Sequence, residues 1–135
     1  MATIGHPLSD ICNLLIAFWG ATAASRPSCD DQASLYWADT RFRPGTTPGL
    51  PPREQLLAWY AAESSPGRHA PTLGEMAWGM AFVAFRTAAI CQGIAARAAV
   101  RQASSAQAAG YAQGRGPLAK FAWELAREGG GRSRL

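Results

Sequence analysis

The chain is poor in the side chains that enzymes use for catalysis. It has 2 histidines and 3 cysteines among 135 residues, and charged residues make up only 16% of it. His69 lies in a stretch rich in proline and glycine, where we expect exposure to solvent, and His6 precedes Pro7, where it can cap a helix. Asp30–Asp31, the one acidic pair, is typical of a turn. There is no glycine-rich phosphate loop, no G-x-S-x-G and no H-E-x-x-H, so the residues alone assemble no active site.

The cysteines, Cys12, Cys29 and Cys91, are widely spaced and odd in number. This pattern indicates neither a zinc site nor a disulfide framework. Cys12 and Cys91 stand in apolar segments, where a thiol behaves as a small buried hydrophobe. Free thiols are typical of a reducing compartment, so we expect an intracellular protein.

A formal charge of +4 raises the question of an anionic partner. The basic residues are scattered and never form a run of four, which argues against nucleic-acid binding. The apolar segment Ile11 to Ala24 ends in small residues, as a signal peptide does, but Asp10 precedes it and no Lys or Arg does. It is also too short to span a bilayer, so we expect no membrane partner.

Apolar residues are abundant, and they concentrate between Met76 and Val100. The first twenty residues of this stretch carry one charge, Arg86. Two apolar rows recur at a spacing of three and four: Trp78, Phe82, Phe85, Ala89, Gly93 and Ala96, and Met76, Met80, Val83, Ile90 and Ile94. Two such rows predict a helix that is buried nearly all round, over about 73–101, as the central post of the fold. Thr72 and Glu75 before it resemble a capping box.

The rest of the chain predicts an all-α fold of about five helices. Pro7 can open the first helix, with Asp10 in its first turn, and Gly20 should end it. We expect inward-facing residues at Leu8, Ile11, Cys12, Leu15, Phe18 and Trp19. A second helix is expected from Pro52 or Arg53 to Glu63, with Leu56, Leu57 and Tyr60 inward.

Two further helices are expected after the central one. Ser104 or Ser105 can cap the helix Ala106 to Gln113. Pro117 then opens or kinks the helix Leu118 to Glu128, with Leu118, Phe121, Ala122 and Leu125 inward. Residues 25–52 are expected to be irregular, with Leu35-Tyr36-Trp37 as an anchor in the core. The helical domain should therefore cover 1–128, and 129–135 should be a flexible tail.

Several blocks of the sequence resemble a known family. ATIGHPLSDICNLL (Ala2 to Leu15) resembles the segment after the metal-binding aspartate in aminoglycoside phosphotransferase-like and choline-kinase-like enzymes, whose pattern is G-D-P-x-x-D-L-A. The histidine at His6 is similar to the kinase-like domain fused to some acyl-CoA dehydrogenases. Further matching blocks follow in order over nearly the whole chain: GLPPREQLLAWYA, AFVAFRTAAICQGIAAR, RQASSAQA and FAWEL.

This resemblance implies the C-terminal helical subdomain of a protein-kinase-like phosphotransferase. In such enzymes ATP and magnesium are held by an N-terminal lobe, an H-x-D-x-x-x-x-N loop and an I-D-W-E-type segment. The chain has none of these motifs and begins where the residues after I-D-W-E should begin, so Met1 resembles a truncation or a downstream start. We therefore expect no catalytic, cofactor-binding or metal-binding residue here, and a fragment that is inactive alone.

Some residues match structural positions of the family. Gly5, His6, Pro7 and Asp10 match the motif that opens a helix under the catalytic loop, where the aspartate braces the loop backbone. Arg86, Gln92 and Arg97 are polar groups on the central helix. They either face the cleft for a small-molecule acceptor or stay at the helix surface with their apolar stems packed.

The last three residues, Ser133-Arg134-Leu135, resemble the peroxisomal address S-K-L. Three glycines separate them from the last predicted helix, which suits a flexible and exposed signal. The protein is thus expected in peroxisomes or otherwise in the cytoplasm.

Two other interpretations stay open. The chain can be a helical interaction module that complements a separate N-terminal half, or a small basic helical domain unrelated to kinases. Self-association is a further expectation, because the helix at Pro7 would lose its covering loop in a fragment.

Overall fold

The computed structural model describes residues 6–23, 39–64 and 70–130, and these residues form helices and the turns that connect them. The α-helices and one 3-10 helix are α1 (Pro7–Ala23), η2 (Thr40–Phe42), α2 (Arg53–Glu63), α3 (Leu73–Ala99), α4 (Ala108–Gln113) and α5 (Arg115–Gly130). The all-α prediction is therefore confirmed for the described ranges. The expectations for Gly5, His69, Asp30–Asp31, Leu35-Tyr36-Trp37 and Ser133-Arg134-Leu135 lie outside them.

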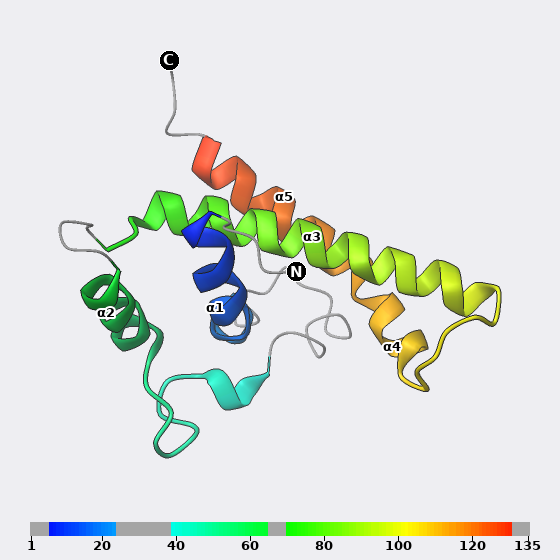
Figure 1. The fold of residues 1–135 in the computed structure, drawn as a ribbon, viewed down its shortest axis with the longest axis horizontal. Helices are drawn as coiled ribbons and strands as arrows, with labels where there is room; N and C mark the ends of the chain where they lie inside the picture. Colours follow the sequence, from blue (N-terminus) through cyan, green and yellow to red (C-terminus); the bar gives the residue numbers. More distant parts are fainter. Residues whose placement is uncertain (1–5, 24–38, 65–69, 131–135) are drawn as a thin grey trace.

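Helix α3 is the axis of the molecule, as the apolar stretch predicted. Helix α5 runs along one side of it, α4 contacts its C-terminal half, and α1 crosses it near its N-terminal half (Figure 1). Helix α2 lies beyond α1 and contributes partly buried residues to the edge of the core: Leu56, Leu57 and Tyr60.

The core lies where α1 and α5 meet α3. It is built from the inward positions predicted for both flanking helices, among them Leu15 of α1 and Leu118 of α5. Met76, Met80 and Val83 of α3 are almost fully buried against them. Gly79 permits the close crossing of α1 over α3, because a Cβ at this position would lie 2.5 Å from the Sγ of Cys12. This crossing depends on a residue without a side chain.

Helix α1 continues beyond the predicted end at Gly20. The helix ends at Ala23, and Ala21 is completely buried. The Nε of Arg43 donates a hydrogen bond of 3.2 Å to the carbonyl oxygen of Ala21, which satisfies one of the carbonyls left open at a helix end. Burial and the high helix propensity of alanine thus outweigh the cost of one glycine.

Both ends of α3 have identifiable caps. Thr72 and Glu75 form the predicted capping box, in which the Glu75 carboxylate accepts from the Thr72 backbone N–H at 2.8 Å. At the other end Arg101 has a φ of +57°. The N–H groups of Arg101 and Gln102 bond to the carbonyl oxygens of Ala98 and Arg97, which is a Schellman motif with arginine at the left-handed position. This motif ends α3 two residues before the predicted boundary.

Helices α4 and α5 form one interrupted unit. Gly114 alone separates them, and the N–H of Leu118 bonds to the carbonyl oxygen of Gly114 across the break. When α4 and α5 are counted as one helix, the described residues contain four α-helical units, and not the expected five. Helix α5 begins at Arg115, before Pro117. The proline is tolerated there because an N–H in the first turn has no partner within the helix, so its loss costs no hydrogen bond. The helix continues to Gly130, two residues into the predicted tail.

The expectation that α3 is buried nearly all round is wrong. Trp78 is 63% exposed, Phe82 46% and Phe85 65%. Ala89 and Ala96 of the same row are exposed too, and Ile90 of the second row is 54% exposed. Helices α1 and α5 cover one side of α3 only, so Met76, Met80 and Val83 of the second row pack in the core and the aromatic residues of the first row face outward.

Candidate functional site

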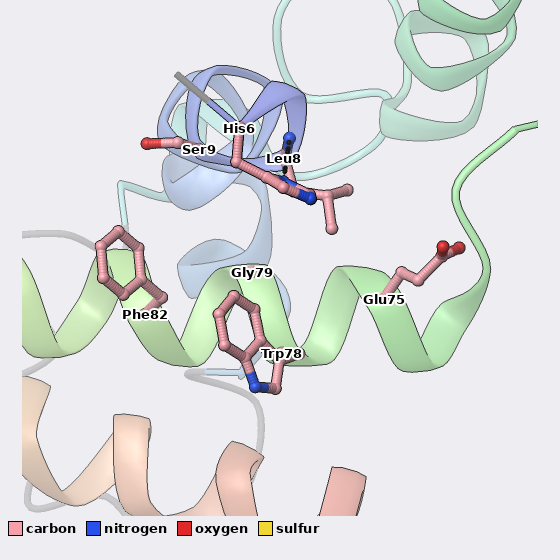
Figure 2. A pocket seen from close by; sticks show the side chains of 7 residues that line it. All are labelled: His6, Leu8, Ser9, Glu75, Trp78, Gly79 and Phe82. Carbon is pink, nitrogen blue, oxygen red and sulfur yellow. Dashed lines mark hydrogen bonds between the residues drawn. The ribbon is translucent and has the colours of Figure 1, made fainter.

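An apolar hollow lies between the start of α1 and the N-terminal half of α3. It has a volume of about 360 Å³. Figure 2 shows His6 and Leu8 on one side of it and the rings of Trp78 and Phe82 on α3. The two rings are parallel within 3° and their centroids are 6.1 Å apart. The residues that line this hollow are His6, Leu8 and Ser9 at the start of α1 and Glu75, Trp78, Gly79 and Phe82 of α3.

A second hollow of about 400 Å³ adjoins the first. The two share His6, Leu8 and Glu75, and the second extends toward Tyr60 and Ser64 at the end of α2. Together they surround the first turn of α1. Sequence reasoning missed this region, because the aromatic residues that line it were assigned to the core. One signal could have revealed it: α3 carries two apolar rows, and together they form more apolar surface than two neighbouring helices can cover.

His6 and Pro7 set the start of α1. The Nδ1 of His6 accepts a hydrogen bond from the backbone N–H of Leu8 at 3.3 Å (Figure 2). The His6 carbonyl accepts from the backbone N–H of Ser9 at 2.8 Å. His6 therefore acts as the helix cap, and Pro7 takes the first helical position. Asp10 lies in the first turn with its side chain exposed.

Arg86 joins α3 to α1. Its guanidinium donates to the Oδ1 of Asn13 at 2.8 Å and contacts the Oγ of Ser9 at 3.5 Å. Gln92 and Arg97 are exposed on the same helix. Arg86 and Arg97 are separated by eleven residues, or about 16 Å along the axis. The three residues therefore do not converge on one point, and neither hollow is lined by them.

The buried thiols are unsuited to nucleophilic chemistry. Burial raises the pKa of the Cys12 thiol to about 11 and also raises the pKa of Cys91. Both are free cysteines, and at neutral pH they remain protonated. The Sγ of Cys12 lies 3.9 Å from the carbonyl oxygen of Met76. Both residues therefore pack as the sequence predicted.

The remaining perturbed groups belong to exposed local pairs. The Arg41 guanidinium hydrogen-bonds to Asp39 and lowers the pKa of that carboxyl group. Their closest atoms are 2.6 Å apart at the start of η2. A backbone hydrogen bond, with help from Arg53, lowers the pKa of Glu54 at the start of α2. These pairs stabilise helix starts and do not face the hollows.

Three comparisons were made with known proteins: no family model, no curated protein and no solved structure matches the chain. Within the described ranges, no group of three or more His, Cys, Asp or Glu residues could hold a metal ion.

Helix α3 is long and apolar enough to cross a membrane by length and composition alone. In its most apolar window 39% of the residues are buried inside the molecule, and the core helix of a globular protein passes the same criterion. The absence of a membrane partner stays a prediction.

Proposed function

We propose that this chain is the C-terminal helical subdomain of an aminoglycoside phosphotransferase-like small-molecule kinase. It is inactive alone and depends on a separate half that carries the ATP lobe and the catalytic loop. ATP and magnesium would belong to that half, and the acceptor would be a small molecule.

The observation that carries the proposal is the state of the first turn of α1. This turn matches the family motif in the order His6, Pro7, Asp10. The Asp10 carboxylate is exposed, and among the described residues no side chain or N–H bonds to it. Its neighbours Ser9 and Asn13 are held by Arg86, so the turn is fixed in place. An ordered turn that presents a carboxylate suits a role in bracing the N–H groups of another segment.

The hollows support the same interpretation. Both are lined by His6 and Leu8 at the start of α1, and the first is mostly apolar; contiguous exposed apolar surface marks an interaction site. The catalytic loop of the resembling enzymes would pack here, over His6 and Leu8.

The first test is calorimetric titration of the isolated chain with ATP and magnesium. We expect no saturable heat, because the chain has neither nucleotide nor metal motifs. Stoichiometric binding in the micromolar range would contradict the proposal.

The second test supplies the missing half. An N-terminal half with the H-x-D-x-x-x-x-N and I-D-W-E motifs, taken from the resembling branch, is co-expressed with this chain. We expect a complex that Asp10→Ala weakens, with Glu63→Ala as the matched control at an exposed acid of α2. Equal binding by wild-type chain and Asp10→Ala would argue against the bracing role.

The alternative is a helical interaction module that complements a separate N-terminal half without completing a kinase, and the exposed row of α3 favours it. Measuring ATP turnover by the assembled complex distinguishes the two functions. A chain that completes a kinase should give a complex that turns over ATP, and an interaction module should give a complex that does not.

A further inference from the structure

The exposed row of α3 has the spacing of a coiled-coil seam. Trp78, Phe82, Phe85, Ala89, Gln92 and Ala96 follow one another at intervals of four, three, four, three and four residues. All six side chains are exposed. A repeat of 3.5 residues keeps one stripe facing a single straight partner over several turns. We call these six residues the α3 seam. It extends for about 27 Å, so its natural partner is another helix of similar length.

The seam is asymmetric in size along its length. Its N-terminal half holds three aromatic residues, and its C-terminal half holds Ala89, Gln92 and Ala96, next to Gly93. A parallel copy would place Trp78 against Trp78 and Ala96 against Ala96, with crowding at one end and a gap at the other. An antiparallel copy places each aromatic residue opposite a smaller side chain, which allows the close packing of a protein interior.

The antiparallel register is internally consistent. When Phe85 lies opposite Ala89 of a second copy, Phe82 lies opposite Gln92 and Trp78 opposite Ala96. Each of these pairs of residue numbers has the same sum, so one two-fold axis relates them all. This is the geometry of an isologous dimer.

Charge supports the same register. Glu75 and Arg97 lie on the same flank of the seam, by their angular positions around the helix. In an antiparallel pair related by a two-fold axis, this flank of one copy lies next to the same flank of the other copy. Glu75 of one copy then lies within about 3 Å, measured along the axis, of Arg97 of the other. The pairing occurs twice and links opposite charges, which favours this orientation.

We propose that the α3 seam is a homodimer interface and that two copies of this chain pair through it in antiparallel fashion. Arg86 does not oppose the pairing, because its guanidinium is turned toward Asn13 and Ser9 of its own α1. The inference concerns a different surface from the Asp10 turn and does not depend on the proposed phosphotransferase origin.

The test is sedimentation equilibrium of the full chain over about 1 to 100 µM, a range in which a standard interface is populated. We expect a monomer–dimer equilibrium for the wild-type chain. Ala89→Glu buries a carboxylate against Phe85 of the second copy and should raise the dimer dissociation constant by roughly tenfold or more. Ala62→Glu, at an exposed alanine of α2, should leave the dissociation constant unchanged.

Helix content and melting of each variant, followed by circular dichroism, separate loss of pairing from loss of folding. Should Ala89→Glu fail to fold, Phe85→Ser removes a side chain that is 65% exposed and serves in its place. A wild-type chain that is monomeric throughout overturns the proposal and leaves the seam to another protein or a lipid surface. Equal dimerisation by wild-type and Ala89→Glu chains overturns it as well.

Orientation is tested by oxidation of Ala96→Cys, with the wild-type chain as the control for its own cysteines. In the antiparallel dimer the two introduced thiols are about 27 Å apart and cannot join. A covalent dimer specific to the variant would show that the helices are parallel and would overturn the proposed register.

Discussion

At the scale of single residues, the contact between Gly79 and Cys12 fixes how closely α1 approaches α3. Cys12 is fully buried, and its Sγ occupies the space that a Cβ on Gly79 would need. Gly93 lies in the same helix, and a Cβ there would meet no atom within 4 Å. Alanine substitutions at these two glycines therefore form a matched test and control.

We predict that Gly79→Ala lowers the free energy of unfolding by about 1 to 3 kcal/mol, because the added methyl group forces the helices apart. Gly93→Ala should raise it by up to about 1 kcal/mol through helix propensity alone. Urea denaturation of both variants at the same dilute concentration measures the difference. A Gly79→Ala protein as stable as Gly93→Ala would mean that the crossing has room to adjust.

The buried thiol of Cys12 predicts a loss of stability at alkaline pH. Its pKa is about 11 in the folded chain against an ordinary value of 9.0. The unfolded chain therefore releases this proton first, and the free energy of unfolding falls as the pH rises from about 9 to about 11. Below pH 9 the contribution is fully retained. The total effect should be at most roughly 3 kcal/mol, since each unit of pKa difference corresponds to about 1.4 kcal/mol.

The measurement compares urea denaturation of the wild-type chain and Cys12→Ala at pH 8 and pH 10.5. All other ionisable groups are common to the two proteins, so the difference between the two pH dependences isolates Cys12. A Cys12→Ala chain that loses as much stability as the wild type between these pH values would rule out the assignment.

At the scale of elements, helix ends are where local chemistry decides the structure. The capping box of Thr72 and Glu75 starts α3 at the predicted residue, and the side chain of Thr72 accepts a hydrogen bond from the N–H of Glu75 at 3.2 Å. The end of α1 was mispredicted because its stabilising contact comes from Arg43, far along the chain. The local capping box was thus predicted, whereas the end of α1, which a residue distant in the chain stabilises, was not.

We predict that Thr72→Ala lowers the free energy of unfolding by about 1 kcal/mol, since the hydroxyl that accepts from the Glu75 N–H is lost, while the backbone N–H at position 72 can still donate to the Glu75 carboxylate. Thr87→Ala in the same helix is the control. The Thr87 hydroxyl bonds to the carbonyl oxygen of Val83 within the helix, so its removal should be neutral or slightly stabilising. Thermal melts followed by circular dichroism give both values, and equal losses for the two variants would contradict the role of the cap.

At the scale of the whole molecule, the exposed apolar surface of α3 and the apolar hollows are the features that a function must account for. The exposed aromatic residues lie on the side of α3 that α1 and α5 leave open, and the hollows lie next to them, at the first turn of α1. The proposed kinase half would use the first turn of α1, and the proposed second copy would use the α3 seam. These two surfaces meet at Trp78 and Phe82, so formation of one complex is expected to influence the other.

A prediction at this scale concerns cellular location. We propose that Ser133-Arg134-Leu135 directs the chain to peroxisomes, by its similarity to the S-K-L address. A fluorescent protein fused to the N-terminus, which leaves Leu135 free, should colocalise with a peroxisomal marker. The matched control lacks Leu135 and should remain diffuse. A diffuse signal from both fusions would sink the idea.

The sequence by itself determined which segments are helical and which residues of α1 and α5 face inward. One packed face per helix gives a clear period, so Leu15, Leu118 and their neighbours were predicted correctly. The first turn of α1 was also predicted, because His6 and Pro7 act through local bonds.

Only the tertiary structure decided which apolar row of α3 is covered. Both rows have helical spacing, so periodicity cannot distinguish them. The answer depends on where α1 and α5 cross α3, and that in turn depends on the fit of Cys12 against Gly79 and on the core that α5 shares with α3. Such contacts join residues far apart in the chain, and no local pattern carries them. The candidate site escaped prediction for this reason: its aromatic residues look like core residues until the number of neighbouring helices is known.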